Sequence, residues 1–308
     1  MQIYLPIADL SVNVFLVFAM GLAVGFISGM FGIGGGFLMT PLLIFLGVSP
    51  AVSVASVTSH IAASSFSGAI NYWRRRAVDL ALAMMLLAGG FIGTAMGVWL
   101  FTVLREIGQL DLAIALSYVI LLSAVGGLMI AESVRAIMRE RHGKPPELRR
   151  PGSHTWFHGL PFKLRFKRSG IYISAIPVLG IGYIIGFVGA VMGIGGGFLL
   201  VPMLIYALRV PTATVIGTSM VLTLVTMASA TVMHAATNHL VDALLALLLM
   251  VGGVTGAQFG ARAGQKMSGE RLRLLLGLLV LAVGIRFALD LIVPPETIYS
   301  IRPLDPDL

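Results

Sequence analysis

Apolar residues follow one another along this chain in runs long enough to form helices, and the runs fall into two matching sets of five. The first set lies at 11–31, 36–48, 52–70, 78–103 and 111–132, and the second lies at 171–192, 197–208, 212–235, 243–261 and 272–293. Most of these runs are close to the length of about 20 apolar residues that a helix needs to cross a bilayer. The second run of each set has only about 12–13 residues, which reach about 20 Å at about 1.5 Å per residue. The pattern predicts an all-α polytopic membrane protein.

The two sets carry the same motifs in the same order, at offsets of 160 to 163 residues. The stretch GMFGIGGGFLMTPLL at 29–43 returns as VMGIGGGFLLVPML at 191–204. Further positions match in pairs: Pro41 with Pro202, Pro50 with Pro211, Thr58-Ser59 with Thr218-Ser219, and Val78-Asp79 with Val241-Asp242. We interpret the chain as an internal duplication, with a first transmembrane repeat at 1–132, a linker loop at 133–170 and a second transmembrane repeat at 171–308.

Composition supports the membrane assignment. The chain is 57% hydrophobic and 11% charged, whereas about a quarter of the residues of a soluble domain are charged. The net charge of +8 does not indicate a nucleic-acid partner, because ten of the 21 basic residues lie between residues 135 and 168. Such clustering is typical of a cytoplasmic loop, and the segment PFKLRFKR at 161–168 also suits anionic lipid headgroups. Residues 1–10 contain no Lys or Arg, so they lack a signal-peptide n-region and we expect 12–31 to be a retained helix.

The positions of the charges also indicate how often each half crosses the membrane. If the short runs do not cross, the basic residues of 262–273 fall on the side opposite the linker. If the short runs do carry the chain across the membrane, each half has five crossings. In that case 18 of the 21 basic residues lie on the same side of the membrane as the linker. The positive-inside rule favours the second arrangement. Five crossings invert the second repeat relative to the first, with the linker in the cytoplasm and both termini outside the cell membrane.

The glycines that precede the short runs predict a binding site. They are Gly34, Gly35 and Gly36 in the first repeat, and Gly195, Gly196 and Gly197 in the second. The first amides of a helix have no partner within it and the helix dipole is positive there, so two such starts that face each other would bind a small anion. Short, Gly/Pro-interrupted segments at matching places of inverted repeats are typical of secondary transporters. The alternative is that the glycines only let helices pack closely, which is the interpretation we favour for the glycines spaced by four at 21–29, 89–97 and 252–260.

Polar residues inside the apolar runs are further candidates. Thr58, Ser59, Thr218 and Ser219 would either donate hydrogen bonds to the anion or bond back to the preceding turn of their own helix. His60 is an intramembrane ionisable residue, so it either couples transport to protons or bonds a neighbouring helix as a neutral ring. Asn71 and His234 would line the path or lie at helix ends. Asp79 and Asp242 would be N-caps or proton carriers.

The doubled glycine–proline motif resembles the TauE/SafE family of membrane permeases, the sulfite exporter family. The resemblance rests on GMFGIGGGFLMTPLL and VMGIGGGFLLVPML, each followed by a Thr-Ser pair and then by Val-Asp. It implies export of sulfite, sulfoacetate or a similar small organosulfonate across the cytoplasmic membrane, with this anion and the membrane lipids as partners. An anion channel, or an importer of related anions such as sulfate or thiosulfate, is the alternative.

An enzyme is the other class considered. The chain contains no Gly-x-Ser-Gly, Gly-x-Gly-Asp or His-Glu-x-x-His motif, and its nearest approach is SFSG at 65–68 with His60. It contains no cysteine, so it has no thiolate ligand for a metal. We therefore expect a transporter without a cofactor or a metal site.

Overall fold

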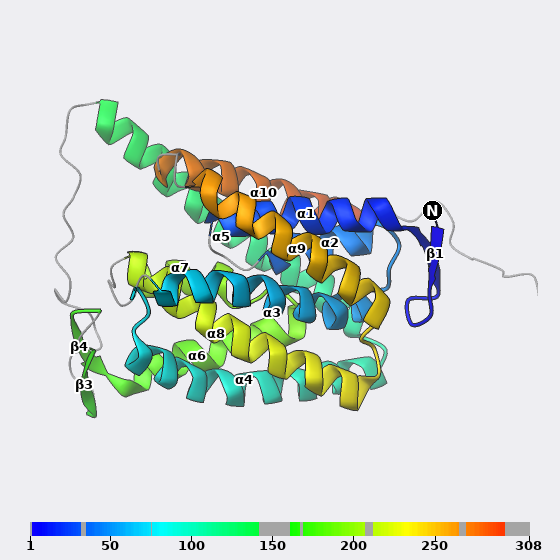
Figure 1. Cartoon of the computed structure of the whole chain (residues 1–308), viewed down its shortest axis with the longest axis horizontal. Coiled ribbons are helices and arrows are strands. Elements are labelled where there is room, and N and C mark those ends of the chain that lie inside the picture. Colours follow the sequence, from blue (N-terminus) through cyan, green and yellow to red (C-terminus); the bar gives the residue numbers. More distant parts are fainter. Residues whose placement is uncertain are drawn as a thin grey trace, which may run out of the picture.

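The fold is a bundle of helices with a small β-hairpin at each end (Figure 1). The computed structural model describes residues 2–31, 35–74, 76–141, 161–166, 169–206, 212–264 and 269–292. The first half contributes α1 (Val14–Phe31), α2 (Gly36–Phe45), α3 (Pro50–Arg74), α4 (Leu80–Glu106) and α5 (Leu110–Arg141). The second contributes α6 (Ala175–Met192), α7 (Gly197–Tyr206), α8 (Thr212–Met233), α9 (Ala243–Gly264) and α10 (Gly269–Ile292), and a π-helical turn, His234–Asn238, extends α8. Each of the ten apolar runs therefore contains a helix.

The helices have the length and composition of a multi-pass membrane protein. Within the described part of the chain, six spans are long and apolar enough to cross a bilayer: 80–106, 110–135, 175–192, 215–238, 243–260 and 274–292. The short helices α2 and α7 have ten residues each. Helix α3 has 25 residues but carries seven buried hydroxyl or imidazole side chains, so it belongs to the interior rather than to the lipid-facing surface. The prediction of an all-α polytopic membrane protein is confirmed.

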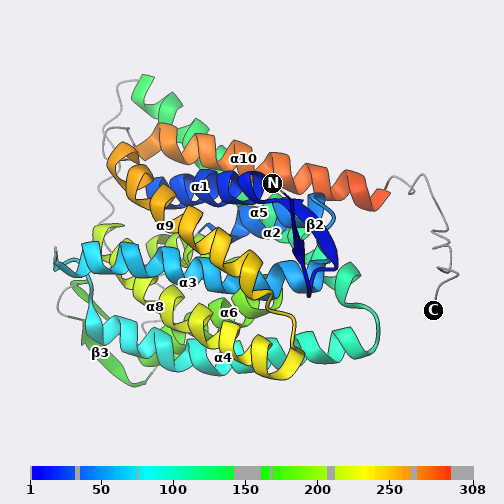
Figure 2. The same cartoon turned by 45° about the vertical axis from the view of Figure 1, so that its right-hand side comes forward.

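Helices of one half pack mainly on helices of the other half (Figures 1 and 2). Helix α1 lies along α9 and α4 lies along α6, while α3 crosses α8 at the centre and α5 lies against α10. In the first pair Gly25 lies against Gly253 and Gly29 against Ala257, so α1 and α9 run parallel. Helices α4 and α6 run parallel in the same way. Each parallel pair therefore joins the two halves of the chain.

Corresponding helices of the two halves run antiparallel where they touch. The Thr58 hydroxyl of α3 lies 2.8 Å from that of Thr231 on α8, while Gly68, further along α3, lies beside Met220. In the outer pair, Gly126 of α5 lies beside Leu281 of α10, whereas Gly284 lies beside Leu122. The order of contacts is reversed in both pairs.

The glycine stripes bring helix backbones into direct contact. A Cβ atom added to Gly29 would collide with the carbonyl of Ala257, and one added to Gly93 would collide with the carbonyl of Tyr183. Dispersion contacts and lipid entropy, rather than a hydrophobic driving force, hold helices together in lipid, so small residues are needed at such crossings. The packing interpretation of these stripes agrees with the structure.

Two β-hairpins flank the bundle, and the sequence did not predict them. Strands β1 (Gln2–Leu5) and β2 (Leu10–Asn13) pair antiparallel before α1. Strands β3 (Lys163–Phe166) and β4 (Ile171–Ser174) pair antiparallel before α6. The two hairpins lie at opposite ends of the bundle (Figure 1). The expected boundaries at 132 and 170 therefore fall inside α5 and between β3 and β4, while residues 142–160 lie outside the described part.

Replacing Gly182 by alanine will test the close helix contacts. The new Cβ would meet the Leu86 carbonyl of α4, so we expect Gly182→Ala to lower the free energy of unfolding by about 1–3 kcal/mol through overpacking. Gly180 lies on the same helix with nothing within 4 Å of an added Cβ, so Gly180→Ala is the matched control. The measurement is thermal unfolding of both purified variants in detergent. Equal melting temperatures would show that the α4–α6 contact is not tight.

Candidate functional site

The two short helices begin at the glycines that the sequence singled out. Gly35 is the N-cap of α2 and has φ of 69°, a left-handed conformation that glycine adopts without a steric penalty. Gly195 has φ of 75°, and the carbonyl of Gly196 accepts from the amide of Leu200 at 2.8 Å, which starts α7. Gly36 and Gly197 are the first helical residues. Gly34 lies outside the described residues.

The start of α2 lies next to the start of α7. The rings of Phe37 and Phe198, the second residues of the two helices, stack with centroids 4.6 Å apart. A Cβ added to Gly36 would stand 2.6 Å from the Gly193 carbonyl and 2.7 Å from that of Ile194, and it would also meet the side chain of Ile61. Glycine at this position therefore lets the two chains approach closely. The helix starts are adjacent, but apolar side chains fill the space around them.

Carbonyl groups at the end of α6 border the same place, and side-chain donors engage two of them. The Thr40 hydroxyl donates to the Gly193 carbonyl at 3.2 Å, and the Tyr118 hydroxyl donates to that of Met192 at 2.7 Å. Each bond reduces the negative potential beside the helix starts. Sequence reasoning missed both residues, although Thr40 lies within the glycine motif and Tyr118 is the one aromatic residue in the run 111–132.

The hydroxyls chosen from the sequence are used mainly by the protein backbone. Thr58, Ser59 and Ser219 each bond the carbonyl three residues earlier, at 2.7, 2.6 and 2.8 Å. The Thr218 hydroxyl accepts from the amide of Asp79 at 3.2 Å. The expected alternative, bonding within the preceding turn, therefore describes three of the four hydroxyls.

The structure changes the pairing of residues between α3 and α8. The hydroxyl that accepts from the amide of Asp242 is that of Ser56, at 3.0 Å, so Ser56 and not Thr58 has the role of Thr218. His60 packs against Gly253 of α9, and in the other half Leu222, together with Thr226 one turn further on, packs against Gly90 of α4. The counterpart of His60 is thus Leu222 and not Met220. The sequence comparison matched identical Thr-Ser pairs, whereas the helix crossings align different positions.

His60 has one ring nitrogen without a partner. Its side chain is fully buried, and Nδ1 lies 2.7 Å from the carbonyl of Leu249. A carbonyl only accepts, so Nδ1 carries the proton and the neutral ring presents Nε2 as an acceptor. Among the described residues Nε2 has no hydrogen-bond partner.

His234 and Asn71 are not brought together. His234 lies at the π-helical turn, where Nε2 lies 3.1 Å from the Ala190 carbonyl and Nδ1 lies 3.3 Å from the Asn238 amide nitrogen. Both ring nitrogens are therefore satisfied. Asn71 is exposed on α3 and donates to the carbonyl of Ser67 at 3.3 Å. These contacts do not form a shared polar path.

Asp79 and Asp242 are N-caps that also hold the hairpins. The Asp79 carboxylate accepts a hydrogen bond from the amide of Leu82 at the start of α4. It also accepts from the amide of Ser169 at 2.9 Å and from its hydroxyl at 2.8 Å, in the turn between β3 and β4. The Asp242 carboxylate accepts from two amides at the start of α9 and from the amide of Ile7, in the turn between β1 and β2, at 3.1 Å. Each carboxylate thus joins a helix start of one half to the hairpin that leads into the other half.

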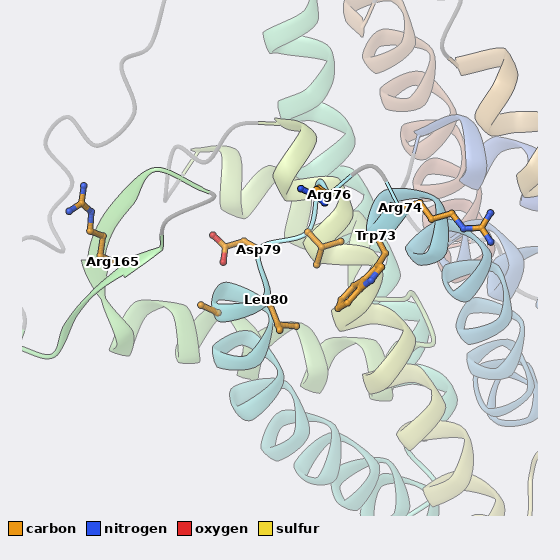
Figure 3. A pocket seen from close by; sticks show the side chains of 8 residues that line it. Trp73, Arg74, Arg76, Asp79, Leu80 and Arg165 are labelled. Atoms are coloured by element: carbon orange, nitrogen blue, oxygen red, sulfur yellow. The ribbon is translucent and has the colours of Figure 1, made fainter.

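A basic cavity opens at the end of the bundle that carries β3 and β4. Its volume is about 630 Å³, and Trp73, Arg74, Arg76, Asp79 and Arg165 are among the lining residues. Figure 3 shows that the side chains of Arg74 and Arg165 point away from each other. The arginines therefore give this end a diffuse positive potential rather than a closed anion site. The described residues contain no group of three or more acidic, His or Cys side chains that could hold a metal ion.

Comparisons with known proteins identify the family. The model of the family described as sulfite exporter TauE/SafE matches residues 17–287. The chain is 31% identical over 272 residues to a probable membrane transporter protein of Xylella fastidiosa, covering 85% of this chain and 90% of that protein. It is 25% identical over 280 residues to the probable membrane transporter protein YjnA of Bacillus subtilis, covering 90% and 99%.

A shorter match is 31% identical over 126 residues to the sulfite exporter TauE/SafE family protein 3 of Arabidopsis thaliana, covering 40% of this chain and 26% of that protein. No solved structure matches the chain. The family model covers most of the chain, including both short helices and their glycine starts. The chain therefore belongs to the sulfite exporter TauE/SafE family of membrane transporters.

Proposed function

We propose that the protein is a secondary transporter that exports sulfite or a small organosulfonate, such as sulfoacetate, across the cell membrane. The observation that carries the proposal is the meeting of the two short helices at their N-terminal ends, where Phe37 stacks on Phe198. The name of the family and the name of the Arabidopsis thaliana relative support sulfite as the first substrate to test.

The anion binds at the glycine-led helix starts. Each start offers amides without a partner in its own helix and the positive end of a dipole equivalent to about half a charge. Two such ends held side by side in a medium of low dielectric repel each other, and a bound anion converts this repulsion into attraction. The stacked rings and Ile61 cover the site in the present arrangement, so the helix starts must separate for the anion to enter.

The two repeats are inverted, and the basic end of the bundle faces the cytoplasm. The antiparallel contacts of α3 with α8 and of α5 with α10 support the inversion, because corresponding helices of inverted repeats run in opposite directions. The arginines around the basic cavity lie at the end that leads into the linker. They would raise the local concentration of anions on the side from which export begins.

His60 is the residue we retain for proton coupling. Its Nε2 is an acceptor inside the bundle that has no hydrogen-bond partner among the described residues. By contrast, both ring nitrogens of His234 and the carboxylate oxygens of Asp79 and Asp242 take part in hydrogen bonds that stabilise the fold. A histidine can gain a proton near neutral pH. Protonation of Nε2 would accompany entry of the anion and would reduce the net charge that moves.

Side chains placed at the helix starts should abolish transport. We expect Gly35→Leu and Gly196→Leu to lower sulfite flux into or out of proteoliposomes by about tenfold or more, because they cover the amides and remove at least about 1.4 kcal/mol of binding. Gly127→Leu is the control, since an added Cβ on that glycine of α5 has nothing within 4 Å. Monodisperse elution after purification shows that each variant is folded. Wild-type flux in both variants would rule out binding by these amides.

Replacing His60 by leucine separates coupling from packing. Leu222 occupies the equivalent place in the other half, so we expect His60→Leu to fold. If Nε2 carries the proton, the variant will lose the response of sulfite flux to an imposed pH gradient. His239→Asn, at an exposed histidine outside the helices, should retain this response. A His60→Leu protein that still follows the pH gradient would remove His60 from the mechanism.

A further inference from the structure

A buried hydroxyl without a partner lies beside the start of α7. Thr223 of α8 is 1% exposed, and its Oγ1 has no hydrogen-bond partner among the residues that the structure describes. A Cβ placed on Gly196 would stand 3.5 Å from this oxygen, so it is the hydroxyl of Thr223 that faces the glycine. Gly196 is also the residue whose carbonyl accepts the first bond of α7. The free hydroxyl is therefore located at the N-terminal end of the second short helix.

The orientation of Thr223 differs from that of other hydroxyls on α8. Ser219, Thr226, Ser229 and Thr231 each donate to a carbonyl three or four residues earlier in the helix. This local bond is open to serine and threonine in any membrane helix. A buried hydroxyl without a hydrogen-bond partner is unfavourable. The orientation of the Thr223 side chain, which leaves its hydroxyl unpaired, therefore requires an explanation.

The matching position of α3 in the first half carries no hydroxyl, although the Ser28 hydroxyl of α1 lies 3.3 Å from a Cβ added to Gly35. Ser56 and Thr218 correspond because each hydroxyl accepts from the amide of an aspartate in the other half. His60 and Leu222 correspond because each packs against a glycine of α9 or α4. The counterpart of Thr223 is therefore Ile61, one position further on. A Cβ added to Gly195 would stand 2.7 Å from the side chain of Ile61. The two halves thus place an aliphatic side chain at one position and a free hydroxyl at the other.

We propose that Thr223 donates the side-chain hydrogen bond that holds the transported oxyanion at the start of α7. This role rests on the transport function proposed above. The oxygens of sulfite or of a sulfonate group accept strong hydrogen bonds from hydroxyls and from backbone amides. Ile61 offers only apolar contact at the matching position of α3, so the hydroxyl near Gly35 in the first half comes from another helix, as Ser28 of α1. The binding site is unequal between the repeats although the glycine motif is duplicated.

Binding of the anion at Thr223 also requires a movement of α6 relative to the start of α7. A Cβ on Gly196 would collide with the side chain of Ile185 on α6, so Ile185 covers the glycine in the present arrangement. The anion reaches Thr223 only when this contact opens. Substrate arrival is thereby linked to a change in packing between α6 and the start of α7.

The experiment compares Thr223→Val with Thr226→Val in the full chain, using sulfite as the probe. Valine keeps the shape of threonine and removes the hydroxyl. We expect the KM for sulfite in proteoliposomes to rise about 10- to 100-fold in Thr223→Val, as for loss of a hydrogen bond to a charged group. Thr226 is buried one turn further along, and its hydroxyl is satisfied by the Leu222 carbonyl, so Thr226→Val should leave the KM unchanged. Thr223→Ser, which keeps a hydroxyl, should restore most of the affinity.

Thermal unfolding distinguishes binding from a structural role. Thr223→Val and Thr223→Ala remove an unpartnered hydroxyl, so without sulfite they should melt no lower than Thr226→Val and should lose the stabilisation that sulfite confers on the wild type. A KM for sulfite within twofold of wild type in Thr223→Val would overturn the proposal, even if Gly196→Leu abolished flux. If the wild-type protein does not transport sulfite or sulfoacetate and neither anion stabilises it, the proposed function fails. The role of Thr223 then fails with it.

Discussion

Backbone-to-backbone contact between the two halves of the chain is the constraint on which the rest of the structure depends. Helices α1 and α9, and helices α4 and α6, approach so closely that added methyl groups at their glycines would collide with carbonyl groups. The largest interfaces all join one half to the other. The two halves are therefore packed together as one interlocked unit. The short helices α2 and α7 are enclosed by this frame, and their positions depend on it.

Under the proposed function, enclosure explains how a protein with few intramembrane charges binds an anion. Helix starts are normally capped or exposed to water. Here the N-cap positions are glycines without a capping side chain, and the starts of α2 and α7 lie together inside the bundle. Thr40 of α2 and Tyr118 of α5 donate to the neighbouring carbonyls at the end of α6. In the proposed site, backbone amides at two helix starts take the place of cationic side chains.

The sequence predicted the fold class and the ten helices well, because long apolar runs separated by Gly, Pro and charged residues define helices in a membrane. It missed the hairpins, whose short alternating strands carry little signal beside the long runs. It located the glycine-led starts of both short helices, since three consecutive glycines are rarely placed inside a helix. It did not identify Ser56, Thr40, Tyr118 or Thr223. The partner of a hydroxyl depends on which neighbouring helix packs against its own helix, and on the position along the helix axis where the two meet. Matching letters also aligned Thr58 with Thr218, whereas the crossings align Ser56.

The π-helical turn His234–Asn238 lies in the stretch where the two halves differ in length. Arg76 and His239 occupy the same place in the loops before Asp79 and Asp242, and both have φ of 53°. Between His60 and Arg76 there is one residue fewer than between Leu222 and His239, so the second half has one extra residue within this stretch. A π-helical turn is wider than an α-helical turn and accommodates such an insertion inside the helix. The extra residue is thus accommodated within the helix, and Asp242 caps α9 as Asp79 caps α4.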